Sequence, residues 1–216
     1  MHVISGQYTG STTLPITVPT GLAHIDVLLV KTSGQRAVLW LNSHPQYQVR
    51  ELGTTVPMAV PAGFTVNVPE GSFVTPSWSG GLVVDARLNN GAFTHDWIAI
   101  QCDGLDSAVG SYVGNLADNR MLDHIGWSPT VALVHRDSDI VQWRSDQEAG
   151  DVTYPMDGAA VFSNRLQALN ALGLELGSST TVNGNGTTFH YFVARDVASI
   201  LNVVPYTGTG LSLIHI

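Results

Sequence analysis

Two short stretches of this chain repeat one pattern of glycine and tyrosine, and no other feature restricts its possible folds as much. Residues 6–10 (GQYTG) are echoed by residues 110–114 (GSYVG). A short polar stretch, a glycine (Gly21 or Gly126) and an apolar run follow in both places. Self-similarity of this kind is typical of a duplicated structural unit, so we expect two related domains.

The match continues beyond the opening and returns near the end of each copy. The apolar runs 26–30 (DVLLV) and 130–134 (TVALV) correspond, and a tryptophan follows each, Trp40 and Trp143. The middles of the two copies do not align well. The closing segments that correspond are 81–84 (GLVV) with 173–176 (GLEL), and 95–99 (HDWIA) with 190–194 (HYFVA).

The expected domain boundaries follow from these matches. Unit one is expected at residues 1–105 and unit two at 106–204, with the junction near 103–108. The opening pattern recurs at 206–208 (YTG), so 205–216 is interpreted as the start of a truncated third repeat. Residues 211–216 (LSLIHI) back-translate as CTG TCT CTT ATA CAC ATC, which reproduces a transposon-end adapter used in sequencing. We therefore expect an adapter-derived tail and a native protein that continues into further repeats.

The composition favours an all-β fold. Only 12% of the residues are charged, while β-branched residues and turn formers are abundant, which suits short strands joined by tight turns. We expect two tandem, related β-sandwich domains, because alternating strands with glycine turns fit two packed sheets. The clearest strands are expected at 25–31, 37–41, 64–68, 81–88, 97–102, 130–135 and 187–194.

Three other segments carry local signals. Residues 165–177 alternate apolar and polar, and Gly173 falls where a turn is expected, so strand, turn, strand is preferred to a short helix. The Asn-Gly segments 89–91 and 183–186 are typical of tight hairpins. The Val-Pro pairs between 56 and 74 predict edge strands or extended loops, since each proline removes a ladder donor.

The charge balance argues against two classes of partner. A formal net charge of −8 at pH 7 disfavours nucleic acids and anionic membranes, both of which attract basic surfaces. No apolar stretch is long enough to span a membrane, and the first residues lack the regions of a signal peptide. The single cysteine, Cys102, is expected to be a small buried hydrophobic residue on an apolar strand.

The second unit carries a pattern found in known proteins. Residues 112–114 (YVG), 125–134 (IGWSPTVALV) and 135–137 (HRD) resemble the opening of a repeat of bacteriophage tail-fibre and other virion proteins. Residues 173–177 (GLELG) and 183–194 (NGNGTTFHYFVA) are similar to the closing segments of that family. Unit one keeps only the opening and the last strands. By analogy, the resemblance implies a jelly-roll or lectin-like β-sandwich displayed on a virion, often in tandem.

Several distinctive residues are interpreted as parts of the fold. Trp127 and Trp143 are expected to be core aromatics that fill volume between sheets, and Gly126 and Gly173 are expected at turns. His95 and His190 stand at matching positions of the two copies. A zinc site is one interpretation of this pair, but repeat equivalence favours structural histidines.

No strong catalytic motif is present. The sequence lacks a Gly-x-Ser-x-Gly elbow, a His-Glu-x-x-His zinc helix and a phosphate-binding loop. We therefore expect no enzyme activity and no required cofactor, with a dispersed triad or a polysaccharide hydrolase as alternatives. Asp137 and Asp139 fall on one side of a strand or turn and are candidate Ca²⁺ ligands. A solvated hairpin tip capped by Asp and Ser is the simpler interpretation.

The candidate ligand-binding residues are aromatics in loops. Trp78 lies in a Ser/Gly/Pro segment, 75–81 (TPSWSGG), and Tyr47 lies in 44–48 (HPQYQ). Such rings stack on the apolar faces of sugars. The alternative is that each ring folds back onto its own sheet.

Together these observations favour a virion structural protein, a tail-fibre or appendage repeat. Its expected partners are other virion proteins and a host-surface glycan, and homo-oligomerisation is left open. Tandem copies on a rigid scaffold multiply weak contacts. The alternative is a carbohydrate-binding module of a bacterial secreted enzyme, and an enzyme that cleaves polysaccharide comes third.

Overall fold

The computed structural model describes backbone and side chains for residues 1–10, 20–32, 37–43, 93–136, 139–156 and 159–196. For residues 16–18, 48–51, 57–59, 65–66, 69–70, 77–78 and 82–84 it describes the strands that they form. The predicted third repeat and its tail, and the Asn-Gly segment 89–91, lie outside the described residues.

The chain is all-β, as predicted, and its sheets are antiparallel. Helix in the described part is limited to a 3-10 turn at Asp123–Ile125 and to α1 (Thr180–Asn183). None of the helices found there has the length and apolar character needed to cross a membrane. The described residues divide into two compact units. Unit one ends at Asp103, and unit two begins at Gly104.

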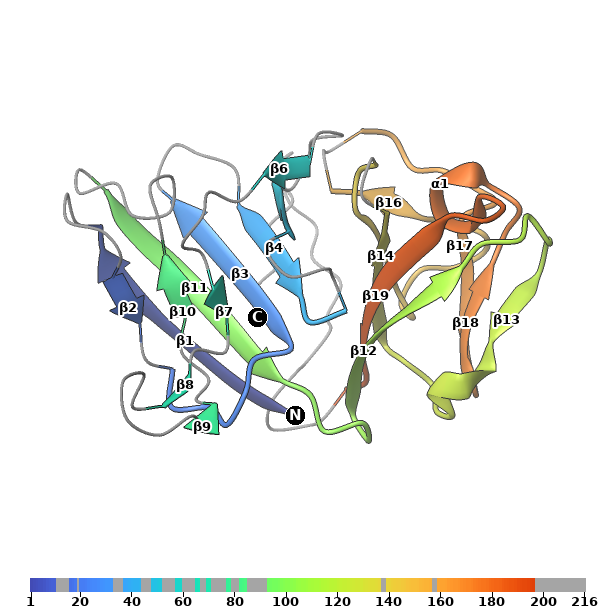
Figure 1. Ribbon diagram of the computed structural model, residues 1–216. Helices are drawn as coiled ribbons and strands as arrows, with labels where there is room; N and C mark the ends of the chain where they lie inside the picture. The colour runs from blue at the N-terminus through green and yellow to red at the C-terminus, as the bar shows by residue number, and fades with distance from the viewer. Residues whose placement is uncertain are drawn as a thin grey trace. The chain divides into compact units, whose positions relative to one another are not determined.

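Unit one contains a six-stranded sheet in the order β1–β11–β3–β4–β5–β6 (Figure 1). A three-stranded sheet, β2–β10–β7, and a two-stranded ladder, β8–β9, are also present. The strand bounds are β1 His2–Thr9, β2 Ile16–Val18, β3 Val27–Thr32, β4 Val38–Leu41, β5 Gln48–Glu51, β6 Pro57–Ala59, β7 Thr65–Val66, β8 Pro69–Glu70, β9 Ser77–Trp78, β10 Leu82–Val84 and β11 Thr94–Gln101.

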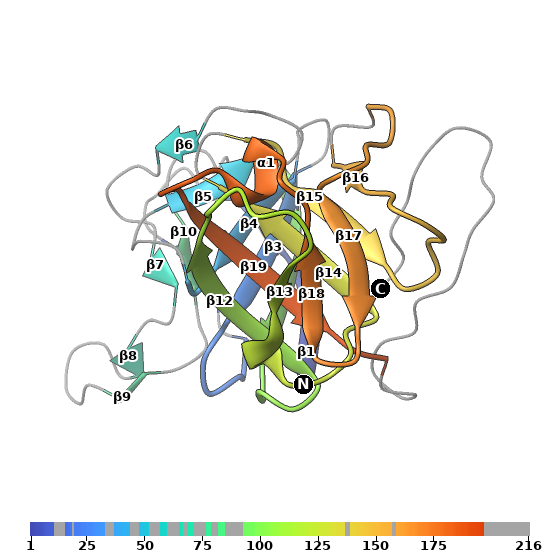
Figure 2. The same cartoon turned by 90° about the vertical axis from the view of Figure 1, so that its right-hand side faces the viewer.

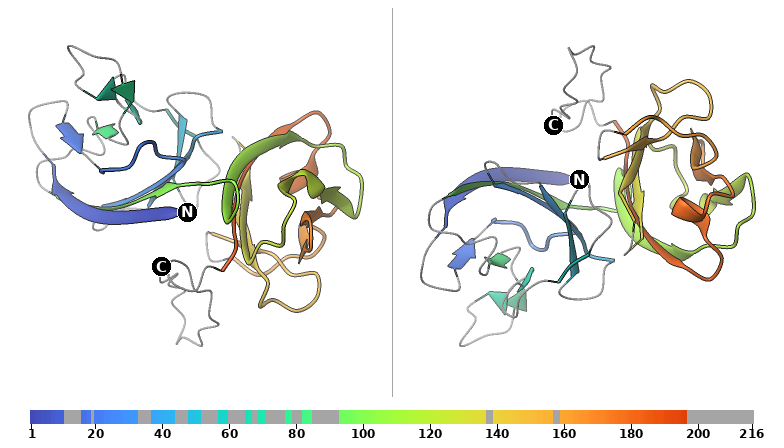
Figure 3. Two further views of the ribbon diagram at one scale, coloured as in Figure 1. Left: turned by 90° about the horizontal axis from the view of Figure 1, so that it is seen from below. Right: turned by 90° about the horizontal axis from the view of Figure 1, so that it is seen from above.

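Unit two contains a five-stranded sheet in the order β12–β19–β14–β15–β16 and a three-stranded sheet in the order β13–β18–β17. Figures 2 and 3 show these two sheets on opposite sides of the interior of the unit. The strand bounds are β12 Ser107–Val113, β13 Arg120–Leu122, β14 Val131–His135, β15 Gln142–Ser145, β16 Tyr154–Pro155, β17 Leu166–Asn170, β18 Gly173–Leu176 and β19 Thr188–Ala194.

Both units follow one strand plan. In each large sheet the last strand of the unit lies between the first strand and the next long strand, giving β1–β11–β3 and β12–β19–β14. In each three-stranded sheet the penultimate strand of the unit is central, β10 in one and β18 in the other. The repeated sequence pattern therefore coincides with a repeated topology.

The register of the ladders shows which residues are equivalent. Gly6 lies opposite Trp97, and Gly110 lies opposite Tyr191. Val30, which matches Val134 in sequence, also pairs with Trp97, while Val134 pairs with Tyr191. Trp97 and Tyr191 are therefore equivalent positions. The predicted match of His95 with His190 is wrong by one residue, and a slip of one residue moves a side chain to the other face of the sheet.

The tyrosine of each opening pattern stacks on its cross-strand neighbour. Tyr8 lies on the ring of His95, with centroids 4.7 Å apart and planes 9° from parallel. Tyr112 lies on Phe189 at 5.3 Å and 16°. His95 and Phe189 are equivalent by the register above. The tyrosine thus has the same packing role in both copies, which explains why it recurs.

The glycine of each opening pattern makes room for an aromatic ring. A Cβ at Gly110 would lie 2.4 Å from Oη of Tyr191, and a Cβ at Gly6 would lie 2.8 Å from Cζ2 of Trp97. Real Cβ atoms do not approach other atoms this closely, so a side chain at either position would displace the ring. The pattern Gly-x-Tyr is therefore a packing requirement of the first and last strands.

The core of unit two takes side chains from both sheets. Leu122, Leu166, Leu174 and Leu176 of the small sheet pack with residues of the large sheet. Val182 of α1 and Ile125 complete the cluster on the helical side. The large-sheet members are Tyr112, Ala132, Val134, Phe189, Tyr191 and Val193.

Several predictions about local structure are confirmed. All seven expected strands are present, at β3, β4, β7, β10, β11, β14 and β19. The segment 165–177 is strand, turn, strand, with β17 and β18 joined between Asn170 and Gly173. Gly126 has φ +79° and ends the 3-10 turn, as expected of a turn glycine. Pro57 opens β6, the edge strand of its sheet, as the Val-Pro pairs predicted.

Four local predictions need correction. The Asn-Gly segment 183–186 does not join two strands, because Asn183 ends α1 and its side chain is fully buried. Trp143 is half-buried on the face opposite the core, so Arg144 and not Trp143 points inward. Trp127 packs only partly against the core. Cys102 follows the end of β11 and is half-buried.

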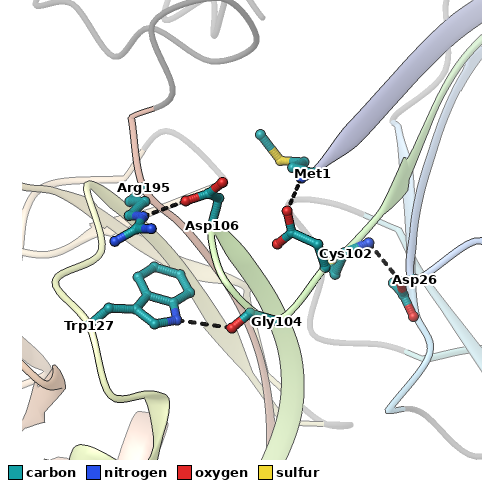
Figure 4. Close-up of polar contacts among 8 residues, drawn as sticks. Met1, Asp26, Cys102, Gly104, Asp106, Trp127 and Arg195 are labelled. Carbon is teal, nitrogen blue, oxygen red and sulfur yellow. Dashed lines mark hydrogen bonds and ion pairs between the residues drawn. The ribbon is translucent and has the colours of Figure 1, made fainter.

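The residues around the boundary are tied to the unit to which each belongs (Figure 4). In unit one, the Cys102 backbone N–H donates to Oδ2 of Asp26 at 2.8 Å, and the amino group of Met1 pairs with Asp103. In unit two, Nε1 of Trp127 donates to the Gly104 carbonyl at 3.3 Å. These bonds fix the end of one large sheet and the start of the next.

Candidate functional site

Two of the four predicted site residues, Tyr47 and Asp137, lie outside the described residues. Trp78 was expected in a loop, but it belongs to strand β9, where it pairs with Pro69, and its side chain is outside the described part. The fourth, Asp139, accepts the Ile140 backbone N–H at 2.9 Å and pairs with Nη2 of Arg136 at 3.2 Å. These contacts fit a capped turn. Within the ranges described above, no group of three or more His, Cys, Asp or Glu residues could hold a metal ion.

The two histidines considered as a zinc pair have different environments. His95 is fully buried, and its Nδ1 lies 2.8 Å from Oγ1 of Thr32. His190 lies opposite His135 in the ladder between β19 and β14, with ring centroids 5.8 Å apart. Both histidines are buried in their own sheets, on non-equivalent positions. The arrangement agrees with packing roles.

The acidic segment after β15 is organised by a buried cation. Arg144 is 4% exposed, and its guanidinium donates to the backbone carbonyls of Glu148 (2.9 Å), Gly150 (2.6 Å) and Leu166 (3.3 Å), and also to that of Val152. Burial lowers the pKa of Arg144 below its usual value, and the nearby acidic residues oppose that shift. The guanidinium thus holds the loop from within, in the way that a bound cation fixes an acidic loop.

An aromatic pair lies on the opposite face of the same strand. Because successive side chains of a strand alternate, Trp143 points away from the core to which Arg144 points. Trp143 pairs with Tyr154 across the β15–β16 ladder, and their rings stack with centroids 5.1 Å apart and planes at 28°. Both rings are partly exposed. The hydroxyl of Tyr154 donates to Oε2 of Glu148 at 2.9 Å.

The hydrogen bond between Tyr154 and Glu148 links the aromatic pair to the acidic loop. It raises the pKa of Tyr154 above its usual value, with burial adding to the effect. The bond also fixes the Glu148 carboxylate beside the rings. Since Arg144 holds the Glu148 carbonyl, both ends of this residue are anchored. We call Trp143, Tyr154 and Glu148 the aromatic–acidic cluster.

The other acidic residues of this loop have separate partners. Asp151 accepts the Asn164 backbone N–H at 2.7 Å, and Oδ1 of Asp146 accepts the side-chain amide of Gln147 at 2.9 Å. Asp146 thus bonds within its own loop, whereas Asp151 ties the loop to the segment before β17. The cluster around Trp143 is therefore the arrangement best suited to binding, because it places ring surface, a hydroxyl and a carboxylate together.

Unit one differs from unit two at these positions. Leu39 lies opposite Arg50 in the ladder that corresponds to the Trp143–Tyr154 pair. Sequence reasoning assigned Trp143 to the core because its large ring would fill volume between two sheets. The run Gln142-Trp143-Arg144 carried the missing signal, since one of the two large neighbours must face outward in a strand.

Comparison of the chain with protein-family models, with curated proteins and with solved structures finds no match.

Proposed function

We propose that this chain is a non-enzymatic structural protein of a bacteriophage virion, a tail-fibre or appendage repeat that also recognises a glycan on the host surface. In this proposal each unit is a β-sandwich of jelly-roll or lectin-like type, and the units are tandem copies. The partners are other virion proteins and the glycan.

One observation carries the proposal: the same strand plan occurs twice in the chain, with the same glycine and tyrosine contacts. One of these contacts accounts for a residue by which unit two resembles tail-fibre repeats, because Tyr112 stacks on Phe189 within the sheet. Duplication of a rigid unit suits an appendage that repeats weak contacts along its length.

A carbohydrate-binding module of a bacterial secreted enzyme is the second candidate. The aromatic–acidic cluster favours it, because partly exposed rings beside a carboxylate suit sugar binding whatever protein displays them. The two candidates therefore differ in context and share the chemistry of recognition.

Genomic context and particle composition distinguish these candidates. Sequencing the parent DNA beyond the gene should reveal neighbouring capsid, portal or baseplate genes, and mass spectrometry of purified particles should detect peptides of this chain. A neighbouring or fused glycoside hydrolase domain, with no virion genes nearby, would favour the module. The non-enzymatic proposal would be contradicted if the chain released reducing sugar from a polysaccharide and substitution of one carboxylate abolished that release.

A further inference from the structure

We propose that Trp143, Tyr154 and Glu148 of unit two form a binding site for a neutral carbohydrate. The inference deepens the recognition role proposed above and rests on it, but it concerns residues other than Trp78 and Tyr47. It follows from the chemistry of the cluster, from the way its loop is held, and from the difference between the two copies.

The side chains of the cluster match the two kinds of surface on a sugar ring. The C–H face of a pyranose packs on an aromatic ring, and Trp143 and Tyr154 both keep part of their ring surface exposed. The hydroxyl groups of a sugar donate well to carboxylates, and Glu148 is partly exposed beside the rings. The hydrogen bond from the Tyr154 hydroxyl to Oε2 of Glu148, at 2.9 Å, keeps the carboxylate beside the rings.

The loop that presents Glu148 is held in place before any ligand arrives. Arg144 donates to the carbonyls of Glu148 and Gly150, while the Asp151 carboxylate accepts the Asn164 N–H. A loop fixed in this way loses little conformational freedom on binding. Arg144 is therefore a positioning residue, which acts on the ligand only through the loop.

Comparison of the two copies separates packing roles from a specific role. Aromatic or planar rings occupy the first and last strands in both units, as in Tyr8 on His95 and Tyr112 on Phe189. The Trp143–Tyr154 pair has no such counterpart, because Leu39 and Arg50 are the residues paired in the ladder at the equivalent positions. The fold therefore does not require aromatics there, and unit two has them for another purpose.

The charge around the cluster selects the class of sugar. Asp146, Glu148 and Asp151 lie in one short loop, and the chain as a whole carries a formal charge of −8. Arg144 is a buried cation beside this loop, and its Nη1 and Nη2 groups donate to backbone carbonyls of the loop. An anionic sugar would be repelled, so the expected ligand is a neutral glycan.

The test is binding of the full chain to an array of neutral and sialylated oligosaccharides, followed by calorimetric titration of the best neutral ligand. Trp143→Ala should weaken binding about tenfold or more, a loss equivalent to one stacked ring. Glu148→Gln and Tyr154→Phe should each weaken it several-fold while leaving the thermal midpoint within the range of the control. Leu172→Ser, an exposed turn residue of the other sheet, is that control and should bind like the wild-type chain.

The outcomes separate this inference from the proposed function. Neutral-glycan binding that survives Trp143→Ala and Glu148→Gln would overturn the site and leave a recognition role elsewhere. No binding of any neutral glycan, or a preference for sialylated ones, would also overturn it, while virion peptides could still support the structural role. If Trp143→Ala fails to fold, Glu148→Gln decides the question, because its substitution keeps the shape of the side chain.

Discussion

Replacing Gly110 by alanine should destabilise unit two more than the same change at Gly6 destabilises unit one. The new Cβ of Gly110→Ala would lie 2.4 Å from Oη and 2.5 Å from Cζ of Tyr191. Tyr191 is 5% exposed, and its hydroxyl lies 2.9 Å from Nε2 of His124. The ring must therefore move within a packed core, and the contact with His124 is lost as it does so.

The size of the effect follows from these contacts. Overpacking of a core and loss of one hydrogen bond together cost about 2–4 kcal/mol. At Gly6 the nearest atom is Cζ2 of Trp97 at 2.8 Å, so Gly6→Ala should cost about 1–2 kcal/mol. Neither glycine has a positive φ, so an alanine there strains the ring contact and not the backbone.

Denaturant unfolding, with hydrogen exchange of peptides from β12 and β19, measures the change in each unit. A second substitution, Tyr191→Leu, removes the ring atoms that the new Cβ meets. In that background Gly110→Ala should be neutral or stabilising by about 0.5 kcal/mol, since alanine restricts the unfolded chain. Equal destabilisation of both backgrounds would refute the reasoning, because the glycine would then have no specific relation to the ring.

Three further predictions concern unit two. Asn183→Asp should lower the free energy of unfolding by about 2–3 kcal/mol, because the Asn183 amide donates to the Ala117 and Gly177 carbonyls and a carboxylate cannot donate. An unchanged free energy in denaturant unfolding would contradict the buried network. Arg144→Met should increase hydrogen exchange of the loop 146–152 with a smaller change in the core strands, and unchanged exchange would show that the guanidinium does not hold it. Burial raises the pKa of Tyr112 above its usual 10, so above about pH 10 the tyrosine ionises in the unfolded chain before it ionises in the folded one. The contribution of Tyr112 to stability is therefore fully present below about pH 10 and falls as the pH rises further. Tyr112→Phe should flatten this alkaline loss in thermal melts at pH about 9 and about 11, and an unchanged slope would assign it to other groups.

Much of the fold could be predicted because its signals are local. Alternation and turn residues placed each expected strand, and the glycine and tyrosine pattern indicated the duplication. The pattern is readable because Gly110 and Tyr112 meet a specific ring across the sheet. Such packing leaves few other residues that fit.

The errors arose where identity of residues was taken for equivalence of position. His95 and His190 are both histidines that precede an aromatic strand segment, but the ladder registers make His95 equivalent to Phe189. Each of these two residues lies opposite the tyrosine of its opening pattern, and His190 lies on the other face of its sheet. Trp143 was assigned to the core for the volume of its ring, although Arg144 occupies the inward position. A one-residue slip in a strand reverses every face, and only cross-strand pairing resolves it.

The candidate site could not be predicted for the same reason. Its residues come from β15, from the following loop and from β16, and they meet only through the register of that short ladder. Asn183 shows a related limit, since its side chain bonds with residues far away in the sequence, including Asn115 and Arg120. An Asn-Gly signal describes backbone preference and does not report such a network.

The central claim is that one strand plan is used twice, and interstrand nuclear Overhauser contacts of the labelled chain test it most directly. The account predicts contacts that place β11 between β1 and β3, with Gly6 opposite Trp97, and β19 between β12 and β14, with Gly110 opposite Tyr191. Contacts that place β12 directly beside β14, or Ser111 opposite Tyr191, would contradict it.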